Sequence, residues 1–198
     1  MRSIKSAAAA ASAVVFASAL SGCSIFSPDH RRIHTQIEYR APTTPENVIH
    51  NIHAVYENLD FNKYDEVLAS DYVFRFQHAD IQSGEADSLI RAEEVTFAEN
   101  LFNKGATLGT VSEPAASKIS LKIDVLDSSP DLRVGHADWV RYEVQTTLLV
   151  TFAGSNVNVD SPATFYFKQE PAGSGTWKFA EWKDEAPNGA PLVAVSRD

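Results

Sequence analysis

Residues 44–76 carry the sequence TPENVIHNIHAVYENLDFNKYDEVLASDYVFRF, which predicts a helix, a shorter second helix and a strand. The pair Thr44-Pro45 suits the N-cap and first helical positions, and Asp60 is placed to cap the second helix. Residues 69–71 are expected to link the second helix to a strand over residues 72–76, where apolar side chains alternate with others. The positions that predict the buried faces of the two helices are Val48, Ile52, Val55, Tyr56, Leu59, Phe61, Tyr64 and Leu68.

A third helix is predicted after a turn at residues 81–85, with Asp87 or Ser88 as its cap. Lys104 and Gly105 suit its end, because a cation complements the carbonyl end of a helix and glycine readily turns left-handed. Its expected inward-facing residues are Ile90, Phe97, Ala98, Leu101 and Phe102.

The hydrophobic period changes from that of a helix to that of a strand after Gly105. Strands are expected around residues 119–125, 137–152, 163–167 and 177–179, with turns at 128–130, 154–156 and 172–175. Helices followed by long antiparallel hairpins indicate an α+β domain. Because the helices can cover only one face of the sheet, we expect the sheet to curl around them.

The composition excludes several functional classes. The chain has 198 residues, one cysteine and a formal net charge of −9. An acidic chain lacks the basic face of a nucleic-acid binder, and one cysteine cannot form an internal disulfide, a thiolate zinc site or an iron–sulfur cluster. No phosphate loop, dinucleotide fingerprint or serine-nucleophile motif is present, so the sequence predicts no cofactor.

The amino terminus has the features of an export signal. Arg2 and Lys5 precede an uncharged, alanine-rich stretch over residues 7–20, which is too short to span a membrane comfortably. It ends in Leu20, Ser21, Gly22 and Cys23, which resembles the lipobox of bacterial lipoproteins. The resemblance implies that Cys23 carries diacylglycerol and becomes the acylated first residue of the mature protein. The alternatives are an ordinary exported protein or an uncleaved anchor with an incidental cysteine.

These observations predict a signal peptide at 1–22, a lipid-anchored tether at 23–43, a domain at 44–185 and a flexible tail at 186–198. Loss of two basic residues with the signal lowers the formal charge of the mature chain to −11, so anionic lipid repels the domain. Residue 24 is serine rather than aspartate, which by resemblance to Gram-negative sorting favours the outer membrane, facing the periplasm.

Three segments resemble the nuclear transport factor 2-like superfamily, also called SnoaL-like or ketosteroid-isomerase-like. They are VYENLD at residues 55–60, YDEVLASDYVF at 64–74 and WKFAEW at 177–182, within a similarity over roughly 45–184. The resemblance implies a cone, in which a curved antiparallel sheet wraps around three helices and leaves a cavity at its open end. Members include isomerases, dehydratases, epoxide hydrolases and cyclases, and also non-catalytic binding or dimerisation modules, so the fold does not fix the function.

The resemblance offers weak candidates for catalysis. At the tyrosine and base positions of ketosteroid isomerases the chain has Ile52 and Phe76, both apolar. Arg75, and Arg141 near Glu143, could serve an epoxide-hydrolase arrangement, but ion pairs on the solvent side explain them better. The remaining candidates are Asp71, His78 and His136; the two histidines lie near strand ends, where exposed histidines are common.

Two histidines and a glutamate share one side of the first predicted helix. His50, His53 and Glu57 lie at helical spacing, as metal ligands can. They lie opposite the apolar face, so a solvent-exposed helix face explains them better than a metal site, and we predict no metal.

The aromatic residues are the remaining signal. Most are expected to fill the core, and the candidates for a pocket or an interface are Tyr56, Tyr72, Phe76, Trp139, Tyr142 and Trp182. Strict alternation places Trp182 on the strand face opposite Trp177 and Phe179. Because one sheet face is left uncovered, a homodimer through that face is a further hypothesis.

The sequence therefore predicts a lipid-anchored protein of the cell envelope with one cone-shaped domain. Our leading hypothesis is a non-catalytic module that binds a small apolar ligand or an envelope protein. The alternatives are a SnoaL-type enzyme with an acidic or histidine general base in the cone, and a purely structural envelope component.

Overall fold

The structure of the chain is a computed structural model that describes residues 36–77, 86–108 and 111–185. The chain divides into two compact units, Met1–Thr35 and Gln36–Asp198, and the described residues belong to the second. The predicted signal peptide, the lipobox with Cys23, the turn at 81–85, His78 and the tail at 186–198 lie outside the described residues.

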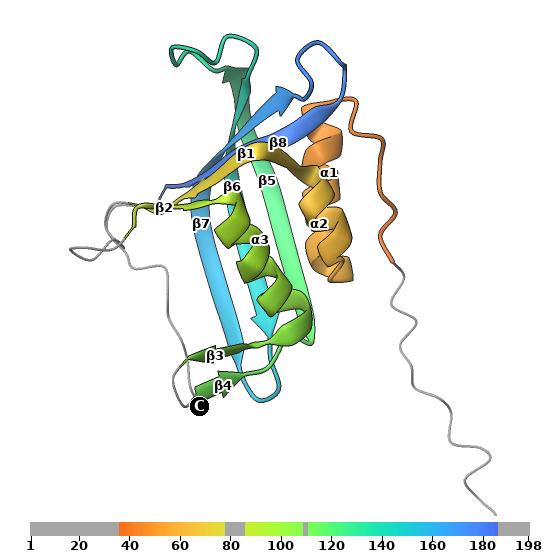
Figure 1. Cartoon of the computed structure of the whole chain (residues 1–198), viewed down its shortest axis with the longest axis vertical. Coiled ribbons are helices and arrows are strands. Elements are labelled where there is room, and N and C mark those ends of the chain that lie inside the picture. Colours follow the sequence, from red (N-terminus) through yellow and green to blue (C-terminus); the bar gives the residue numbers. More distant parts are fainter. Residues whose placement is uncertain (1–35, 78–85, 109–110, 186–198) are drawn as a thin grey trace, which may run out of the picture. The chain divides into compact units, whose positions relative to one another are not determined.

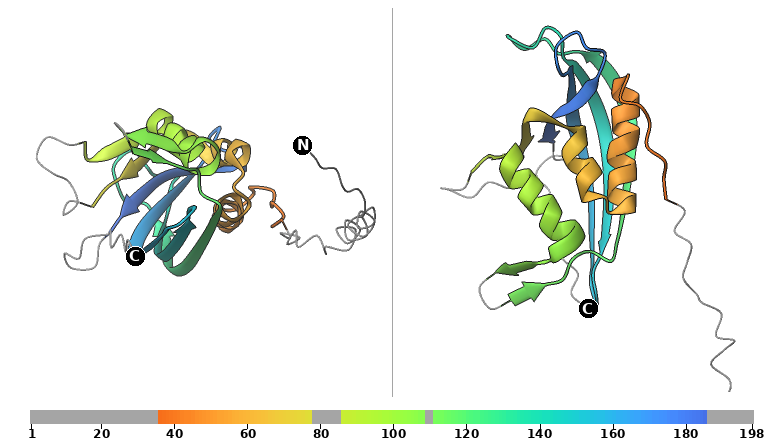
Figure 2. Two further views of the ribbon diagram at one scale, coloured as in Figure 1. Left: turned by 90° about the horizontal axis from the view of Figure 1, so that it is seen from below. Right: turned by 45° about the vertical axis from the view of Figure 1, so that its right-hand side comes forward.

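Helices come first and long strands follow. The elements are α1 (Pro45–Asn58), α2 (Phe61–Val67), β1 (Leu68–Arg75), β2 (Ser88–Ile90), α3 (Arg91–Glu99), the π-helical turn η3 (Asn100–Lys104), β3 (Ala106–Leu108), β4 (Val111–Glu113), β5 (Lys118–Pro130), β6 (Val140–Thr151), β7 (Asn156–Gln169) and β8 (Trp177–Asp184) (Figure 1). The main sheet has six strands in the order β2-β1-β8-β7-β6-β5, and only β1 and β8 are parallel neighbours. The helices lie together on one side of this curved sheet (Figure 2), which confirms the predicted α+β cone.

The first two helices begin where the sequence predicts. The Thr44 hydroxyl accepts a hydrogen bond from the Asn47 N–H at 3.3 Å, and an Asp60 carboxylate oxygen accepts one from the Lys63 N–H at 3.1 Å. Between the helices, Leu59 adopts a left-handed conformation with φ of 53°, which ends α1. These caps fix a tight corner that brings both helices onto the sheet.

The third helix differs from its prediction. Residues 88–90 pair with β1 as strand β2, so α3 begins only at Arg91. Ile90 and Phe97 were expected to face inward, but they are 58% and 54% exposed. The buried face instead runs through Glu94, Ala98 and Phe102, at intervals of four residues. The π-helical turn η3 continues α3 and ends at Lys104 and Gly105, where the predicted helix also ends, with a glycine φ of 72°.

Two strands are longer than the sequence indicates. Strand β1 begins at Leu68, so residues 69–71 belong to the strand and not to a link. Residues 128–130 pair with β6 instead of forming a turn, because pairing resumes after an irregularity between Val125 and Asp127. The connection between β5 and β6 is therefore residues 131–139.

Residues 36–43, here called the strap, pack against α1 and are not the free tether that the sequence suggests. Asn51 of α1 accepts a hydrogen bond from the N–H of Arg40 and donates one to its carbonyl, each at 2.8 Å. Asn58 makes the same pair of bonds with Ile37, at 2.9 and 2.8 Å. Asn51 and Asn58 are seven residues apart on the helix, and their partners Arg40 and Ile37 are three residues apart in extended chain. Both intervals span about 10 Å, so each asparagine lies beside its partner in the strap. Figure 2 shows the strap on the side of α1 away from the sheet.

The predicted strand face of Trp182 is wrong because strand β8 contains an irregularity. Tyr166 pairs with Glu181 while the next residue, Phe167, pairs with Phe179, so Ala180 has no partner in the register. This extra residue brings Phe179 and Trp182 onto the same inner face, where strict alternation would separate them. The Trp182 ring lies 4.7 Å from that of Phe165.

Candidate functional site

Three phenols and one carboxyl group converge inside the cone. Tyr56 comes from α1, Tyr64 from α2, Tyr72 from β1 and Glu94 from α3, and all four side chains are buried. The Tyr64 hydroxyl donates a hydrogen bond to Glu94 Oε1, and the Tyr56 hydroxyl donates one to the Tyr64 oxygen at 3.5 Å. We call these four residues the phenol cluster.

The surroundings of the phenol cluster favour neutral side chains. Burial raises the pKa of the Glu94 carboxyl, and the hydrogen bond from Tyr64 only partly opposes this. Burial also raises the pKa values of Tyr56, Tyr64 and Tyr72, and the nearby Glu94 adds to the effect. A protonated carboxyl and phenols are hydrogen-bond donors, so the cluster has the chemistry of a site that stabilises a developing oxyanion.

The same cluster is closed to solutes in this structure. Glu94 is 5% exposed, and the Phe102 ring packs edge-on against Tyr56 and Tyr64 with centroids 5.4 and 5.8 Å apart. A carboxyl so enclosed has almost no surface that a substrate could reach in this structure. The sequence analysis missed Glu94 as a site residue, although its position four residues before Ala98 could have revealed that it faces inward.

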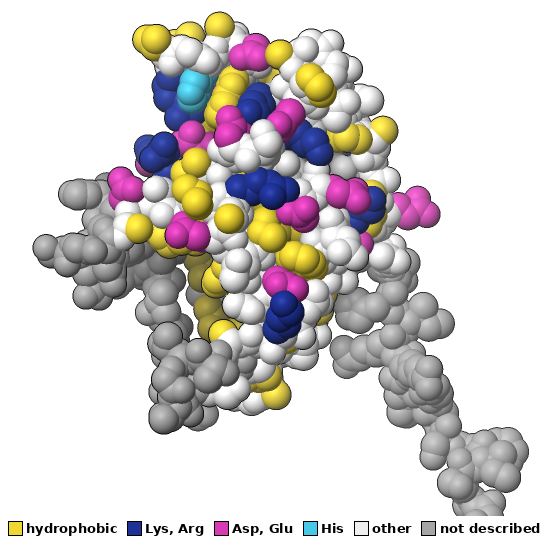
Figure 3. Space-filling model, viewed as in Figure 1, with side chains coloured by type: hydrophobic (Ala, Val, Ile, Leu, Met, Phe, Trp, Pro, Cys, Tyr) yellow, Lys and Arg dark blue, Asp and Glu magenta, His cyan; other side chains and the backbone are white. Residues whose placement is uncertain are grey.

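Apolar side chains that remain partly exposed line the inside of the cone next to the core. They are Phe74, Val95, Leu101, Leu148, Val157 and Trp182, from β1, α3, η3, β6, β7 and β8. Figure 3 shows hydrophobic side chains recessed over β7, beside α3. A concave, mostly apolar wall of this kind is suited to a small apolar ligand.

Polar groups within this wall are mostly paired. The Thr146 hydroxyl donates to the Ser161 carbonyl at 2.9 Å, and the Ser161 hydroxyl donates to Asp184 Oδ1 at 2.8 Å. The indole nitrogen of Trp182 is different, because it is buried and has no hydrogen-bond partner among the described residues.

The predicted catalytic candidates that the structure describes lie outside the cone. Asp71 pairs with Lys168 at 2.6 Å, Arg141 pairs with Glu143 of its own strand, and the candidate Arg75 pairs with Glu181 at 3.0 Å. Figure 3 shows basic and acidic side chains interspersed over β1 and β8. Arg75 and the candidate His136 belong to one ion-pair network, joined through Glu181, Arg133 and Asp131, whereas Asp71 and Arg141 pair elsewhere.

The connection between β5 and β6 folds back on the outer sheet face through Arg133. Its guanidinium group pairs with Asp131 at 2.8 Å and with Glu181 at 2.9 Å, and it lies 3.8 Å from the centre of the Tyr166 ring. Burial pushes the pKa of Asp131 up, but hydrogen bonds from Arg133 and His136 outweigh burial and hold that pKa below its usual value. The network holds the loop against the outer face of the sheet.

The remaining aromatic candidates have separate places. Trp139 stacks on His136 with ring centroids 4.1 Å apart, next to Arg133 of the outer face. Tyr142 faces inward and donates a hydrogen bond to Glu46, while Phe76 is partly exposed just after β1. Of the six candidates, the cone interior thus receives Tyr56, Tyr72, Tyr142 and Trp182.

His50, His53 and Glu57 do not form the solvent-exposed face that the sequence predicts. His53 Nδ1 lies 2.6 Å from the Leu121 carbonyl oxygen, and Glu57 accepts a hydrogen bond from the Leu121 N–H at 3.1 Å. The two side chains thereby cover the open edge of strand β5 at this residue. His50 Nε2 lies 2.9 Å from the Glu38 carbonyl oxygen of the strap. The described part of the chain contains no group of three or more potential metal ligands.

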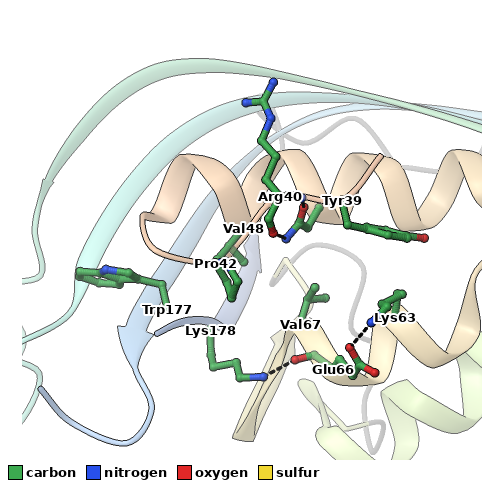
Figure 4. Close-up of a pocket in the computed structure, with 10 residues that line it drawn as sticks. Tyr39, Arg40, Pro42, Val48, Lys63, Glu66, Val67, Trp177 and Lys178 are labelled. Atoms are coloured by element: carbon green, nitrogen blue, oxygen red, sulfur yellow. Dashed lines mark hydrogen bonds and ion pairs between the residues drawn. The ribbon is translucent and has the colours of Figure 1, made fainter. Parts of the chain in front are cut away.

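A cavity of about 220 Å³ lies between the strap, α1, α2 and the start of β8 (Figure 4). The backbone N–H of Trp177 donates a hydrogen bond to the Pro42 carbonyl at 2.7 Å, and Lys63 pairs with Glu66 at 2.6 Å. Lys178 donates to the Glu66 carbonyl. Two of the lysines that line the cavity, Lys63 and Lys178, are thus already engaged, with the Glu66 carboxylate and the Glu66 carbonyl respectively.

No family model and no curated protein matches the sequence. Among solved structures, a provisionally assigned aromatic ring hydroxylase from Novosphingobium aromaticivorans is similar, with 13% identity and a TM-score of 0.53 over 81% of this chain and 96% of its own. A provisionally assigned scytalone dehydratase from the same organism is 8% identical, with a TM-score of 0.51 over 72% of this chain and 80% of its own. A nuclear transport factor 2-like protein from Cytophaga hutchinsonii is 15% identical, with a TM-score of 0.45 over 72% of this chain and 94% of its own.

The fold is that of the nuclear transport factor 2-like proteins. At these low identities the similarity establishes the nuclear transport factor 2-like architecture and leaves the activity open. Within the described residues, no helix has the length and apolar character needed to cross a membrane.

Proposed function

We propose that this protein is a non-catalytic binding module whose cone receives a small, mostly apolar molecule. The observation that carries the proposal is the apolar inner wall, to which Phe74, Leu148 and Trp182 contribute while remaining partly exposed. Aromatic and aliphatic walls favour apolar ligands by removing their surface from water.

The placement of the ionisable groups supports binding over catalysis. A general acid or base must come within hydrogen-bond distance of the reacting atom. Glu94 is buried, while Asp71 and Arg75 are engaged in ion pairs on the other face of the sheet. The alternative is a SnoaL-type enzyme in which Glu94 is the acid, and its raised pKa is the observation that favours it.

We further propose that the domain is held at the cell envelope by lipid on Cys23. The support is the lipobox-like sequence of residues 20–23 after a short apolar stretch. Residues 24–35 then separate the anchor from the strap, which is a reach of roughly 40 Å when fully extended. The domain would work close to the membrane surface, on the periplasmic side of the outer membrane.

Binding of a neutral fluorescent probe tests the proposed function. We would titrate residues 23–198, with Cys23→Ser, with N-phenyl-1-naphthylamine, because this protein retains the whole unit that begins at Gln36. Saturable one-to-one binding is expected. Leu148→Glu on the inner wall should abolish it, and Leu132→Glu, at a residue 93% exposed in the β5–β6 connection, should leave it unchanged. Absence of saturable binding, or equal loss in both variants, would contradict the proposal.

A further inference from the structure

Strand β5 is an edge of the six-stranded sheet, and only part of that edge is covered. The sheet order places β5 last, with β6 as its neighbour and α1 beside it (Figure 1). At Leu121 the N–H donates a hydrogen bond to Glu57, and the carbonyl oxygen lies 2.6 Å from His53 Nδ1, so α1 closes the edge there. Where the backbone groups of an edge strand stay open, they can pair with another extended chain.

The next backbone groups that face the edge belong to Ile123 and Val125. In an antiparallel pair, successive residues alternate between facing the partner strand and facing away from it, so these two residues point the same way as Leu121. Beyond the ladder with β6, no hydrogen bond within the described residues reaches the backbone of either residue. The edge therefore offers donors and acceptors in the pattern that a second strand requires.

The same stretch exposes apolar side chains, whereas protected sheet edges usually carry charged ones. Val125 is 48% exposed, and Leu126, the extra residue in the β5–β6 pairing, is 65% exposed. A cavity of about 310 Å³ lies between α1 and β5, and its lining residues are Glu46, Ile49, His50, His53, Ile123 and Val125. A strand added at this edge would direct alternate side chains toward this cavity, where apolar ones would contact Ile49, Ile123 and Val125.

The outer face of the edge selects the charge of the remaining side chains. Asp127 is exposed and pairs in register with Glu143, whose chain neighbours Tyr142 and Val144 are buried on the inner side. Asp127 and Glu143 therefore lie on the outer face. Glu143 is bound to Arg141, but no cation among the described residues pairs with Asp127. Basic side chains on the outward positions of an added strand would be attracted to this carboxylate.

We propose that the edge of β5 over residues 123–128 is a docking site for an extended segment of a partner protein in which apolar and basic side chains alternate. The backbone of the segment bonds to Ile123 and Val125, its apolar side chains enter the cavity beside α1, and its basic side chains lie near Asp127. The site uses none of the residues of the inner wall, so it is independent of ligand binding in the cone.

The peptide acetyl-VKVKVKV-amide tests the inference in two N-methylated forms. In an extended chain, the N–H groups of the valines all face one edge and those of the lysines face the other. Methylating either set of nitrogens blocks one edge and leaves the side chains and the charge unchanged. We would titrate residues 23–198, carrying Cys23→Ser, by calorimetry. One methylated form should bind about tenfold more weakly than the unmethylated peptide, and the other should bind within about threefold of it. Equal affinities of the two forms, or no saturable binding of the unmethylated peptide, would overturn the inference.

Matched variants locate the site. Val125→Lys removes an apolar contact and repels the basic peptide, so it should weaken binding about tenfold. Leu149→Lys makes the same change at a residue of β6 that is 40% exposed and lies away from the edge, and it should change binding less than about threefold. Equal weakening by the two variants would indicate attraction to the acidic chain as a whole and would contradict the proposed site.

Amide hydrogen exchange gives a readout that needs no variant. Exchange at Ile123 and Val125 should be fast in the free protein and should slow when the peptide is bound. Slow exchange before the peptide is added would mean that a second copy or another segment of this chain already covers the edge, and it would overturn the inference. Unchanged exchange at saturation would do the same. Neither result alters the binding of N-phenyl-1-naphthylamine, which tests the cone separately.

Discussion

Glu94 is a carboxyl group held where its neutral form is preferred. Its hydrogen-bond partner is the Tyr64 phenol. It lies four residues before the buried Ala98 and therefore on the same inward face of α3. The folded-state pKa lies above the unfolded value of about 4.3. The wild-type protein therefore loses stability as the pH rises from the unfolded pKa to the folded pKa, and keeps the lower stability at higher pH.

Glu94→Gln should remove this pH dependence, because an amide does not titrate and still accepts the hydrogen bond from Tyr64. The free energy of unfolding of the variant minus that of the wild type should be more positive at pH 8 than at pH 4, as measured by urea denaturation. Glu143→Gln, at an exposed carboxylate, is the control and should show little change in this difference. An equal difference at both pH values for Glu94→Gln would contradict the buried-acid interpretation.

At the residue scale the sequence predicts which residues cap the helices, but not which distant side chains meet inside the cone. Thr44 and Asp60 are recognisable because a cap acts on residues two or three positions away. Glu94 and Tyr64 lie 30 positions apart, and only the packing of α2 against α3 brings them together. Trp182 was misplaced because a single extra residue in β8 reverses the face of every later side chain.

The strap is the element whose attachment depends most on side chains. Asn51 and Asn58 each hold one backbone N–H and one backbone carbonyl of an extended segment that has no sheet partner. Residues 36–43 show no hydrophobic period, so the sequence predicts that they belong to the tether. Asparagines at positions seven apart on α1 were the available signal, and recognising them requires knowing what packs against that face.

Asn51→Ala should cost about 2 kcal/mol in the free energy of unfolding, because Asn51 is buried and two backbone groups of Arg40 lose their partners. Amide hydrogen exchange at Arg40 should accelerate at the same time. Asn47→Ala, which removes an exposed bond to the Ala41 carbonyl, should cost clearly less. Unchanged exchange at Arg40 would show that the strap is held by other contacts.

The β5–β6 connection depends on Arg133 in a comparable way. Arg133→Ala should destabilise the protein by about 2 kcal/mol, since Asp131 loses its main cation and buried Glu181 keeps only Arg75. Arg141→Ala removes one exposed pair and should cost less than about 0.5 kcal/mol. Chemical denaturation measures both, and equal costs would contradict the assignment of the network to loop stability.

Whole elements were more predictable than their ends. The helical period of residues 45–58 and the alternation in β5 to β8 correctly predict a helix and strands. Each pattern arises because one face of the element is buried. The sequence predicts too early a start for α3 because residues 88–90 extend the sheet at its edge, through a long-range pairing with β1 that no local pattern reveals. For the same reason, β5 extends through Ser128 and Pro130 although both residues favour turns.

At the scale of the whole molecule, the order of helices and strands was sufficient to predict the cone. The inner face could not be assigned in the same way, because its openness depends on how completely neighbouring side chains fill it. Of the partly exposed residues that line it, only Trp182 is a pocket candidate in the sequence analysis, because Tyr56, Tyr72 and Tyr142 are buried.

Cys23→Ser should release the protein from the membrane fraction or leave it with an uncut signal, because the proposed anchor is the acylated sulfur. The wild-type protein should appear in the membrane fraction, with a mass that corresponds to residues 23–198 plus acyl chains. Detection of an unmodified Cys23 in the processed wild-type protein would contradict the anchor. Ser24→Ala is the control and should remain acylated.

The central claim is that the inside of the cone, rather than its outer surface, receives an apolar molecule. Methyl-resolved nuclear magnetic resonance during titration with 2-isopropylnaphthalene tests this most directly. We expect saturable shifts at Leu101, Leu148 and Val157, with little change at the exposed Leu132 and Val134. Shifts confined to Leu132 and Val134, or no saturable shift at any methyl group, would contradict the account.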